Sequence, residues 1–436
     1  MLITDLHNKF LECYERSGRK FIKPVPVVAN DDPDLMFIIS GMVPFKKYFC
    51  GDAKAPHSRM YNAQPCIRTV DLVDVGDVKH LTYFEMLGNW SFGNVDRRGS
   101  ITNAWLFLTE TLRIPANRLV VTVFKGDTEK NIPPDITSID IWRELGLRSD
   151  QIFFLGKDNF WGPAGADGPC GPCTEIHYDR LGGPLPERFP EDDTDERFME
   201  IWNAGVFLEY HKSADGHMQS IAGPGLAAGA GLERLASVVQ EVPSVYDTDE
   251  MSILLAQVRA DCRLHSTGRD LSQGRKVVDH IRAISAIAAE GVKPGRDGPS
   301  HVLRRLIRRA YAVFAAHGEW DNDLSDLLHL ATDQLGRRYP HLKATLYQTS
   351  ITVAGEIRSF ETPLRRGMDD LDELLGRQSL EVSETDLISL NGRHGLPRDI
   401  AIAVVEGRGG KVIGEDYKNV YAQHRHVSKG DQGRIK

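Results

Sequence analysis

Two arginines and a phenylalanine in the N-terminal half of the chain are of the types that hold a nucleotide. Arg68 stands on one apolar-flanked segment and Phe84 on another, with a loop between them. On the two strands of a hairpin, an arginine can pair with a phosphate while an aromatic ring stacks on a base. Arg234 begins an amphipathic helix, whose N-terminus favours anionic ligands. We therefore expect nucleotide contacts from all three residues.

The segments around these residues are suited to a small pocket. The run "GLAAGAG" (225–231) precedes the helix of Arg234, and its small side chains leave room for a ligand. The segments "DNFWGPAGADGPCGPCTEI" and "EIWNAGVF" place Trp161 and Trp202 beside glycine-rich stretches, and aromatic side chains commonly wall ligand pockets.

The six cysteines do not form the pattern of a disulfide framework. Only Cys170 and Cys173 make a C-x-x-C pair. A closed zinc site needs two further ligands, and the nearest candidate is His177. We expect a tight Gly/Pro loop with small buried thiols and no bound metal.

The composition is that of a soluble globular protein, with 41% apolar and 26% charged residues in 436 positions. No apolar run approaches the roughly 20 residues that span a bilayer, and the N-terminus is predicted to be an amphipathic helix, so we expect a cytoplasmic protein. The net charge of −8 argues against a broad nucleic-acid surface. The four arginines of "HVLRRLIRRAYAVF" could form a phosphate-binding ridge or a solvated helix face.

The pattern of apolar residues divides the chain. Short β-type runs (34–40, 118–124, 151–156, 197–203, 206–212) and a helical pattern at 101–114 predict an antiparallel α+β domain over 1–240. A D-G turn after residue 211 predicts a hairpin. From 241 to 380 the 3.6-residue period predicts an all-helical domain, and 381–436 an extension of it with a frayed tail at 423–436.

The segments described above resemble the signature motifs of class II aminoacyl-tRNA synthetases, and specifically the alanyl-tRNA synthetase family. The matching strings are "ISGMVPFK", "YFEMLGNWSFG", "DNFWGPAGADGPCGPCTEI", "EIWN", "GAGLERLASVVQ", "DHIRA" and "HVLRRLIRRA", and the resemblance extends to about residue 405. It implies a six-stranded antiparallel sheet with flanking helices. The resemblance also implies that a helical domain follows, which in the family cradles the tRNA acceptor stem.

The resemblance also implies roles for individual residues. Arg68 would contact the α-phosphate of ATP, Phe84 and Arg234 would sandwich the adenine, and Lys79 or His80 would lie near the phosphates. The amino-acid pocket would be walled by Met42, Trp161, Asn203 and Val206, over a floor that includes Ala227 and Gly229. The implied reaction is attack of a carboxylate on the α-phosphorus of ATP, assisted by Mg²⁺, with no covalent nucleophile and no resident metal site.

The chain departs from the family at several points. Ala227 stands where the family has the aspartate that pairs with the substrate's α-ammonium group, and an unpaired ammonium in a dry pocket is costly. Either another acid, with Glu209 and Asp167 as candidates, replaces that aspartate, or the substrate differs from free alanine. The loop between Arg68 and Phe84 is shorter and lacks the family's tip. Gly298 and Gly392 replace the asparagine and aspartate that read the G·U wobble pair, so direct readout is expected to be lost.

The resemblance includes no counterpart of the family's editing and C-terminal domains, which predicts a short paralogue. Three functions remain open: a ligase that adenylates alanine or a related carboxylic acid and transfers it to a small molecule or carrier; a minimal alanine–tRNA ligase; or a non-catalytic nucleotide-binding regulatory module. We expect a monomer with no membrane partner.

Overall fold

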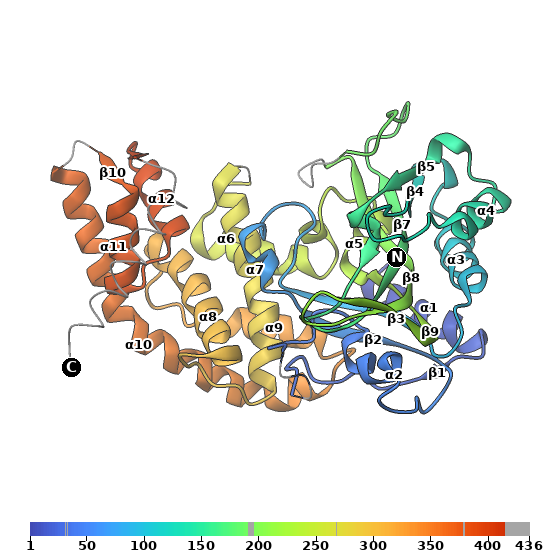
Figure 1. Cartoon of the computed structure of the whole chain (residues 1–436). Helices are drawn as coiled ribbons and strands as arrows, with labels where there is room; N and C mark the ends of the chain where they lie inside the picture. Colours follow the sequence, from blue (N-terminus) through green and yellow to red (C-terminus); the bar gives the residue numbers. More distant parts are fainter. Residues whose placement is uncertain (31, 33, 191–195, 267, 378–379, 415–436) are drawn as a thin grey trace. The chain divides into compact units, whose positions relative to one another are not determined.

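The computed structural model describes residues 1–30, 32, 34–190, 196–266, 268–377 and 380–414 (Figure 1). The chain divides into two compact units, of which the first is Met1–Ile253 and the second begins at Leu254. The frayed tail expected at 423–436 lies outside the described residues.

The first unit is built on one mixed sheet in the order β1-β2-β3-β9-β8-β7-β4-β5. Its six central strands are antiparallel, as expected: β2 (Arg59–Ile67), β3 (Tyr83–Ser91), β9 (Met218–Gly231), β8 (Phe198–Lys212), β7 (Gly168–Asp179) and β4 (Leu119–Phe124). Two short strands add parallel pairs at the edges, β1 (Lys20–Phe21) beside β2 and β5 (Ile152–Leu155) beside β4. A ninth strand, β6 (Phe160–Trp161), pairs with β7 outside this order.

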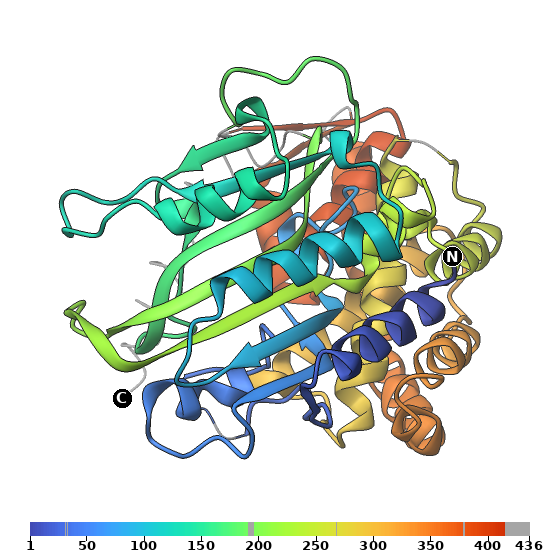
Figure 2. The same ribbon diagram turned by 90° about the vertical axis from the view of Figure 1, so that its right-hand side faces the viewer.

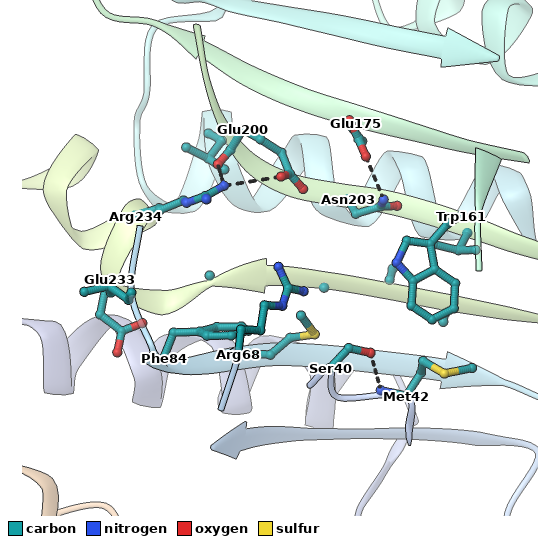
Figure 3. Close-up of a pocket in the computed structure, with 18 of the residues that line it drawn as sticks. Ser40, Met42, Arg68, Phe84, Trp161, Glu175, Glu200, Asn203, Glu233 and Arg234 are labelled. Carbon is teal, nitrogen blue, oxygen red and sulfur yellow. Dashed lines mark hydrogen bonds and ion pairs between the residues drawn. The ribbon is translucent and has the colours of Figure 1, made fainter. Parts of the chain in front are cut away.

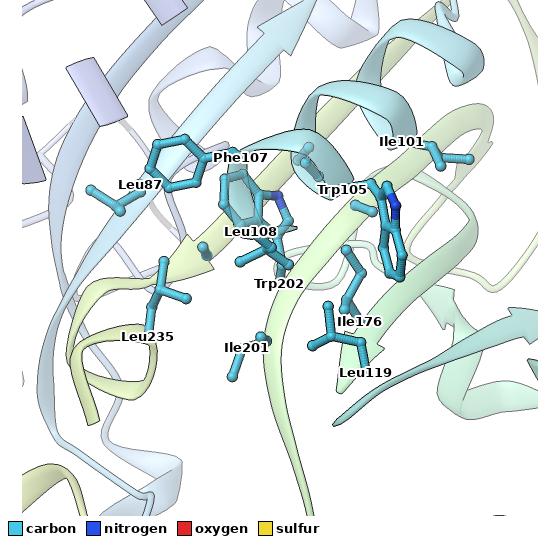
Figure 4. Close-up of a cluster of buried hydrophobic side chains, with 14 of the residues drawn as sticks. Leu87, Ile101, Trp105, Phe107, Leu108, Leu119, Ile176, Ile201, Trp202 and Leu235 are labelled. Atoms are coloured by element: carbon cyan, nitrogen blue, oxygen red, sulfur yellow. The ribbon is translucent and has the colours of Figure 1, made fainter. Parts of the chain in front are cut away.

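One face of the sheet is covered by helices and carries the main hydrophobic core. Helices α1 (Ile3–Arg16), α3 (Arg97–Leu106) and α4 (Ile136–Glu144) cross this face (Figure 2). Together with α5 (Leu232–Val239) they bury the apolar residues that alternate strand positions direct to this side. Phe107, Trp105 and Trp202 are among the large side chains at its centre (Figure 4).

The opposite face carries a second cluster and the cavity described below. Here the short helix α2 (Lys46–Cys50) and the loop before it pack on side chains from the same strands. Phe45 lies with its ring centroid 4.5 Å from that of Trp90 on β3. Each strand therefore divides its side chains between a helix-covered core and a ligand-facing layer.

Most predicted elements of this unit are present, with one exception. Segments 197–203 and 206–212 form one long strand, and the D-G turn joins it to β9, with Lys212 opposite Met218 as the hairpin prediction required. The predicted strand at 34–40 is wrong: it forms only a bridge between Phe37 and Val28. This segment crosses the end of the β2–β3 pair as a loop, since the N–H of Ile67 donates to the carbonyl of Ile38.

The second unit is mainly helical, as expected. It contains most of α6 (Met251–Cys262) and all of α7 (Gly268–Ala289), α8 (Gly298–Ala316), α9 (Ser325–Leu335), α10 (His341–Arg377), α11 (Glu384–His394) and α12 (Arg398–Gly407). A parallel pair that the sequence did not predict, β10 (Glu381–Ser383) with β11 (Lys411–Ile413), makes the unit not wholly helical. In the described residues, no helix is long and apolar enough to cross a membrane.

Two of the four arginines of α8 pair with carboxylates inside the second unit. Arg308 contacts Glu356 of α10 at 2.6 Å, and Arg309 contacts Asp399 of α12 at 2.7 Å. Both side chains are partly buried, at 30% and 14% exposure. Neither a free phosphate-binding ridge nor a fully solvated face describes them.

The close packing of β7 against β8 gives a stability prediction. A Cβ atom on Gly171 would overlap the carbonyl oxygen of Phe207, which is backbone and cannot move aside. Gly171→Ala should therefore lower the free energy of unfolding by about 1–3 kcal/mol, measured by denaturant titration. Gly223→Ala on β9 is the control, because nothing lies within 4 Å of its Cβ position. Equal stability of the two variants would contradict this packing.

Candidate active site

The predicted site residues meet in a cavity of about 200 Å³ in the first unit (Figure 3). Of the eleven predicted, ten line it: Met42, Arg68, Lys79, Phe84, Trp161, Asn203, Val206, Ala227, Gly229 and Arg234. Residues as far apart as 42 and 234 converge here because the sheet order places β3, β9 and β8 side by side.

Arg68 and Phe84 lie together on the β2–β3 hairpin. The backbone N–H of Arg68 donates to Thr82 and its Nε donates to the carbonyl of Ile39, at 2.8 and 2.9 Å. Its guanidinium carbon is 4.8 Å from the centre of the Phe84 ring, a cation–π distance. The Arg68 side chain is thus held by the hydrogen bond of Nε and by stacking on Phe84. The two Nη groups of its guanidinium can bind an anion.

Arg234 reaches the cavity from the first turn of α5. The helix start is fixed by Glu233, a buried residue whose carboxylate accepts from the backbone N–H of Glu85 on β3. Nη1 of Arg234 donates to the carboxylate and the carbonyl of Glu200, both at 3.3 Å. Figure 3 shows Arg234 and Phe84 on opposite sides of the cavity, and both can reach a ligand between them.

His80 is the predicted residue that the structure does not bring to the cavity. Its Nδ1 lies 2.5 Å from a carboxylate oxygen of Asp77, and its carbonyl accepts from the hydroxyl of Tyr246. Asp77 also accepts from the backbone N–H groups of Lys79 and His80. This turn directs Lys79 to the cavity and His80 to Asp77, so of these two predicted residues only Lys79 lines the cavity.

The predicted amino-acid wall surrounds the other end of the cavity. In the sheet register, Val206 lies opposite Ala227, and Asn203 lies opposite Gly229. Trp161 stands on β6, which pairs with β7. Because the β9 positions carry a methyl group or no side chain, the space between these elements stays open.

The acids expected to replace the missing aspartate lie elsewhere. Glu209 pairs with Arg97 at 2.5 Å, Asp167 pairs with His211 at 3.1 Å, and neither lines the cavity. Two carboxylates that the sequence reading missed, Glu175 and Glu200, do line it. The sequence feature that could have pointed to them is an acidic residue within an otherwise apolar strand pattern, "CTEI" for Glu175 and "MEIW" for Glu200.

Glu175 is held in the cavity wall by contacts with Asn203, Cys173 and His177. Its Oε1 accepts from Nδ2 of Asn203 at 3.2 Å and from the thiol of Cys173 at 3.7 Å, and its Oε2 lies 3.5 Å from Nε2 of His177. Burial raises the pKa of Glu175, and repulsion from Glu200 raises it further. These two effects outweigh the contacts with His177 and Cys173, which lower the pKa, so the ionised carboxylate is only partly compensated.

The C-x-x-C pair lies in a strand, and the predicted tight loop is wrong. Cys170 and Cys173 belong to β7, with a register shift between them, and both are fully buried. Burial raises the pKa of Cys170 to about 11 and raises that of Cys173 well above its ordinary value. Among the described residues, no group of three or more His, Cys, Asp or Glu side chains is placed to hold a metal ion.

This fold and this cavity define a class of protein. An antiparallel sheet whose hairpin carries Arg68 and Phe84, facing an arginine at the start of the next helix, is the arrangement that the motifs implied. Residues 5–436 match the family model for class II (A) tRNA synthetases, and the chain belongs to that family.

The individual relatives carry the name alanine–tRNA ligase. The enzyme of Rubrobacter xylanophilus is 36% identical over 433 residues, covering 94% of this chain and 48% of that protein. The mitochondrial enzyme of Saccharomyces cerevisiae is 33% identical, covering 98% and 46%. The chain thus spans about half the length of these relatives. The solved structure of Staphylococcus aureus histidyl-tRNA synthetase, 10% identical over 59% of this chain and 75% of its own, has a TM-score of 0.34, too low to add to the assignment.

The uncompensated charge of Glu175 gives a pH-dependent prediction. Because folding raises the pKa of this acid, the charge penalises the folded state as the pH rises above the ordinary value of 4.5. Glu175→Gln should raise the free energy of unfolding at neutral pH and change it little below pH 4.5, where the carboxyl group is protonated in both the folded and the unfolded state. Denaturant titrations at several pH values measure this.

The same change at Glu209 is the control. Its carboxylate is paired with Arg97, so Glu209→Gln should leave stability unchanged or lower it. A Glu175→Gln variant less stable than the wild type at neutral pH would show that the hydrogen bonds of Glu175 outweigh its desolvation.

Proposed function

We propose that this chain activates alanine with ATP and transfers the alanyl group to tRNA. The observation that carries the proposal is that one cavity is lined both by Arg68, Phe84 and Arg234 and by the residues predicted to bind the amino acid. The names of the relatives support the substrate and the acceptor. A non-tRNA acceptor, which the sequence departures had favoured, has no observation in its support.

The chemistry follows from the charges around the cavity. An oxygen of the alanine carboxylate attacks the α-phosphorus of ATP, the bond from that phosphorus to the bridging oxygen breaks, and pyrophosphate leaves. Negative charge grows on the phosphate oxygens, and Arg68 and Arg234 are placed to stabilise it. Phe84 offers a ring face for the adenine. In the second step the tRNA hydroxyl attacks the alanyl carbonyl and AMP leaves.

Magnesium fits this site as a companion of ATP. When bound, Mg²⁺ neutralises phosphate charge, and it is usually held by one or two carboxylates together with substrate phosphates. The carboxylate of Glu200, on the cavity wall beside Arg234, is an oxygen donor of the right kind.

The first prediction tests the phosphate contact. Arg68→Ala should lower the rate of alanine-dependent ATP–pyrophosphate exchange by more than about 10²-fold, because one charge-stabilising group is lost. Arg148→Ala is the control, since Arg148 is exposed, pairs with Asp150 and does not line the cavity. Near-normal exchange in Arg68→Ala would refute the assigned role.

The identity of substrate and acceptor is tested on the wild-type protein. Exchange measured across the twenty amino acids should be fastest with alanine, and radiolabelled alanine should become attached to tRNA. Exchange without charging would revive the non-tRNA acceptor, and absence of both would leave the regulatory module.

The second unit gives a prediction on tRNA selectivity. Gly298 begins α8 with a φ of +54°, and Gly392 lies exposed on α11, where nothing is within 4 Å of a Cβ position. With no base-reading side chain at either position, a tRNA whose acceptor G·U pair is changed to G·C should be charged within about 10-fold of the unchanged tRNA. A bidentate contact would typically discriminate by about 1–3 kcal/mol. A preference for G·U above 100-fold would contradict this expectation.

A further inference from the structure

The cavity contains a carboxylate whose charge the fold leaves without a strong cation. Glu175 lines the cavity with a side chain 16% exposed, and the structure pairs it with no lysine or arginine among the described residues. Its partners are the amide of Asn203, the thiol of Cys173 and the ring of His177. A buried charge of this kind is costly unless a ligand compensates it.

The two arginines of the cavity are engaged away from Glu175. Arg234 pairs with Glu200 at 3.3 Å, and Arg68 stacks on Phe84. Figure 3 shows Glu200 beside Arg234, whereas Glu175 and Asn203 lie at the end of the cavity near Trp161. The cavity therefore has a positive end suited to phosphates and an acidic end suited to a small cation.

The cation that fits the acidic end is an amino group. Asn203, opposite Gly229 in the sheet, fixes Oε1 of Glu175 through Nδ2, and its own Oδ1 is fixed by the N–H of Gly205. The neighbouring β9 residues Ala227 and Gly229 offer no polar side chain. The negative charge that pairs with a ligand's ammonium group therefore has to come from another strand of the sheet.

We infer that Glu175 is the counter-charge for the α-ammonium group of the substrate, held in position by Asn203, and that it restricts the substrate to α-amino acids. This assignment rests on the proposed function. It makes Glu175 a specificity-determining residue and Asn203 a positioning residue. The des-amino and hydroxy analogues of alanine are excluded because they would leave the carboxylate uncompensated.

The test compares alanine and ATP kinetics in Glu175→Gln. The variant should raise the KM for alanine in pyrophosphate exchange by roughly 30-fold or more, since truncating one side of a buried charge pair commonly costs that much. The KM for ATP should change by less than about 3-fold, because the nucleotide end is untouched. It should also reduce the preference for alanine over L-lactate, in kcat/KM, by a similar factor.

Glu209→Gln serves as the matched control. It makes the same substitution at a carboxylate on the neighbouring strand, β8, that does not line the cavity. It should keep the wild-type KM for alanine. An ATP-dependent thermal shift in Glu175→Gln checks that the variant folds and retains its nucleotide site.

A folded Glu175→Gln variant with an unchanged KM for alanine, or a wild type that activates L-lactate as well as alanine, overturns the assignment. A wild type that exchanges with neither substrate refutes the proposed function itself, so the two failures are distinguishable. If Glu175→Gln does not bind ATP, Asn203→Ala replaces it, and an unchanged alanine KM there overturns the positioning of the carboxylate.

Discussion

The site depends on a strand that carries almost no side chains where it crosses the middle of the sheet. Residues 227–231 of β9 are alanine and glycine only, and they lie between β3 and β8. A Cβ on Gly229 would come within 3.1 Å of Met86, and one on Gly88 of β3 within 2.5 Å of Trp90. Large side chains from β3 occupy this layer, so the cavity exists because β9 contributes so little.

The same strand leads directly into helix α5. Gly231 ends β9 and is the N-cap of α5, and Glu233 fastens the first helical turn to the backbone of β3. Arg234 is thereby fixed relative to the hairpin that carries Phe84. The small residues and the arginine after them thus act together. The strand leaves the cavity open, and the helix places the guanidinium group of Arg234 at the edge of the cavity.

The sequence predicted the elements better than the contacts between them. Strand alternation and the 3.6-residue period are local, so the sheet, the hairpin at 212–218 and the long helices could all be predicted. The contact of Glu175 with Asn203 could not be predicted, because it depends on the β7–β8 register, which shifts at several bulges. For the same reason the expected replacements, Glu209 and Asp167, are wrong: Glu209 pairs with Arg97 and Asp167 with His211, outside the cavity.

The charges of the second unit limit how it can meet an acceptor. Burial alone would raise the pKa of Asp399, but Arg309 and Lys276 lower it to about 2, so this ion pair persists across the physiological range. Two cations are thus engaged between α7, α8 and α12, and Arg308 is engaged with Glu356. Each cation used in this way is lost to counter-ion release from a phosphate backbone. In the proposed complex with tRNA, phosphate contacts from this unit would therefore come from those of its basic side chains that no carboxylate engages.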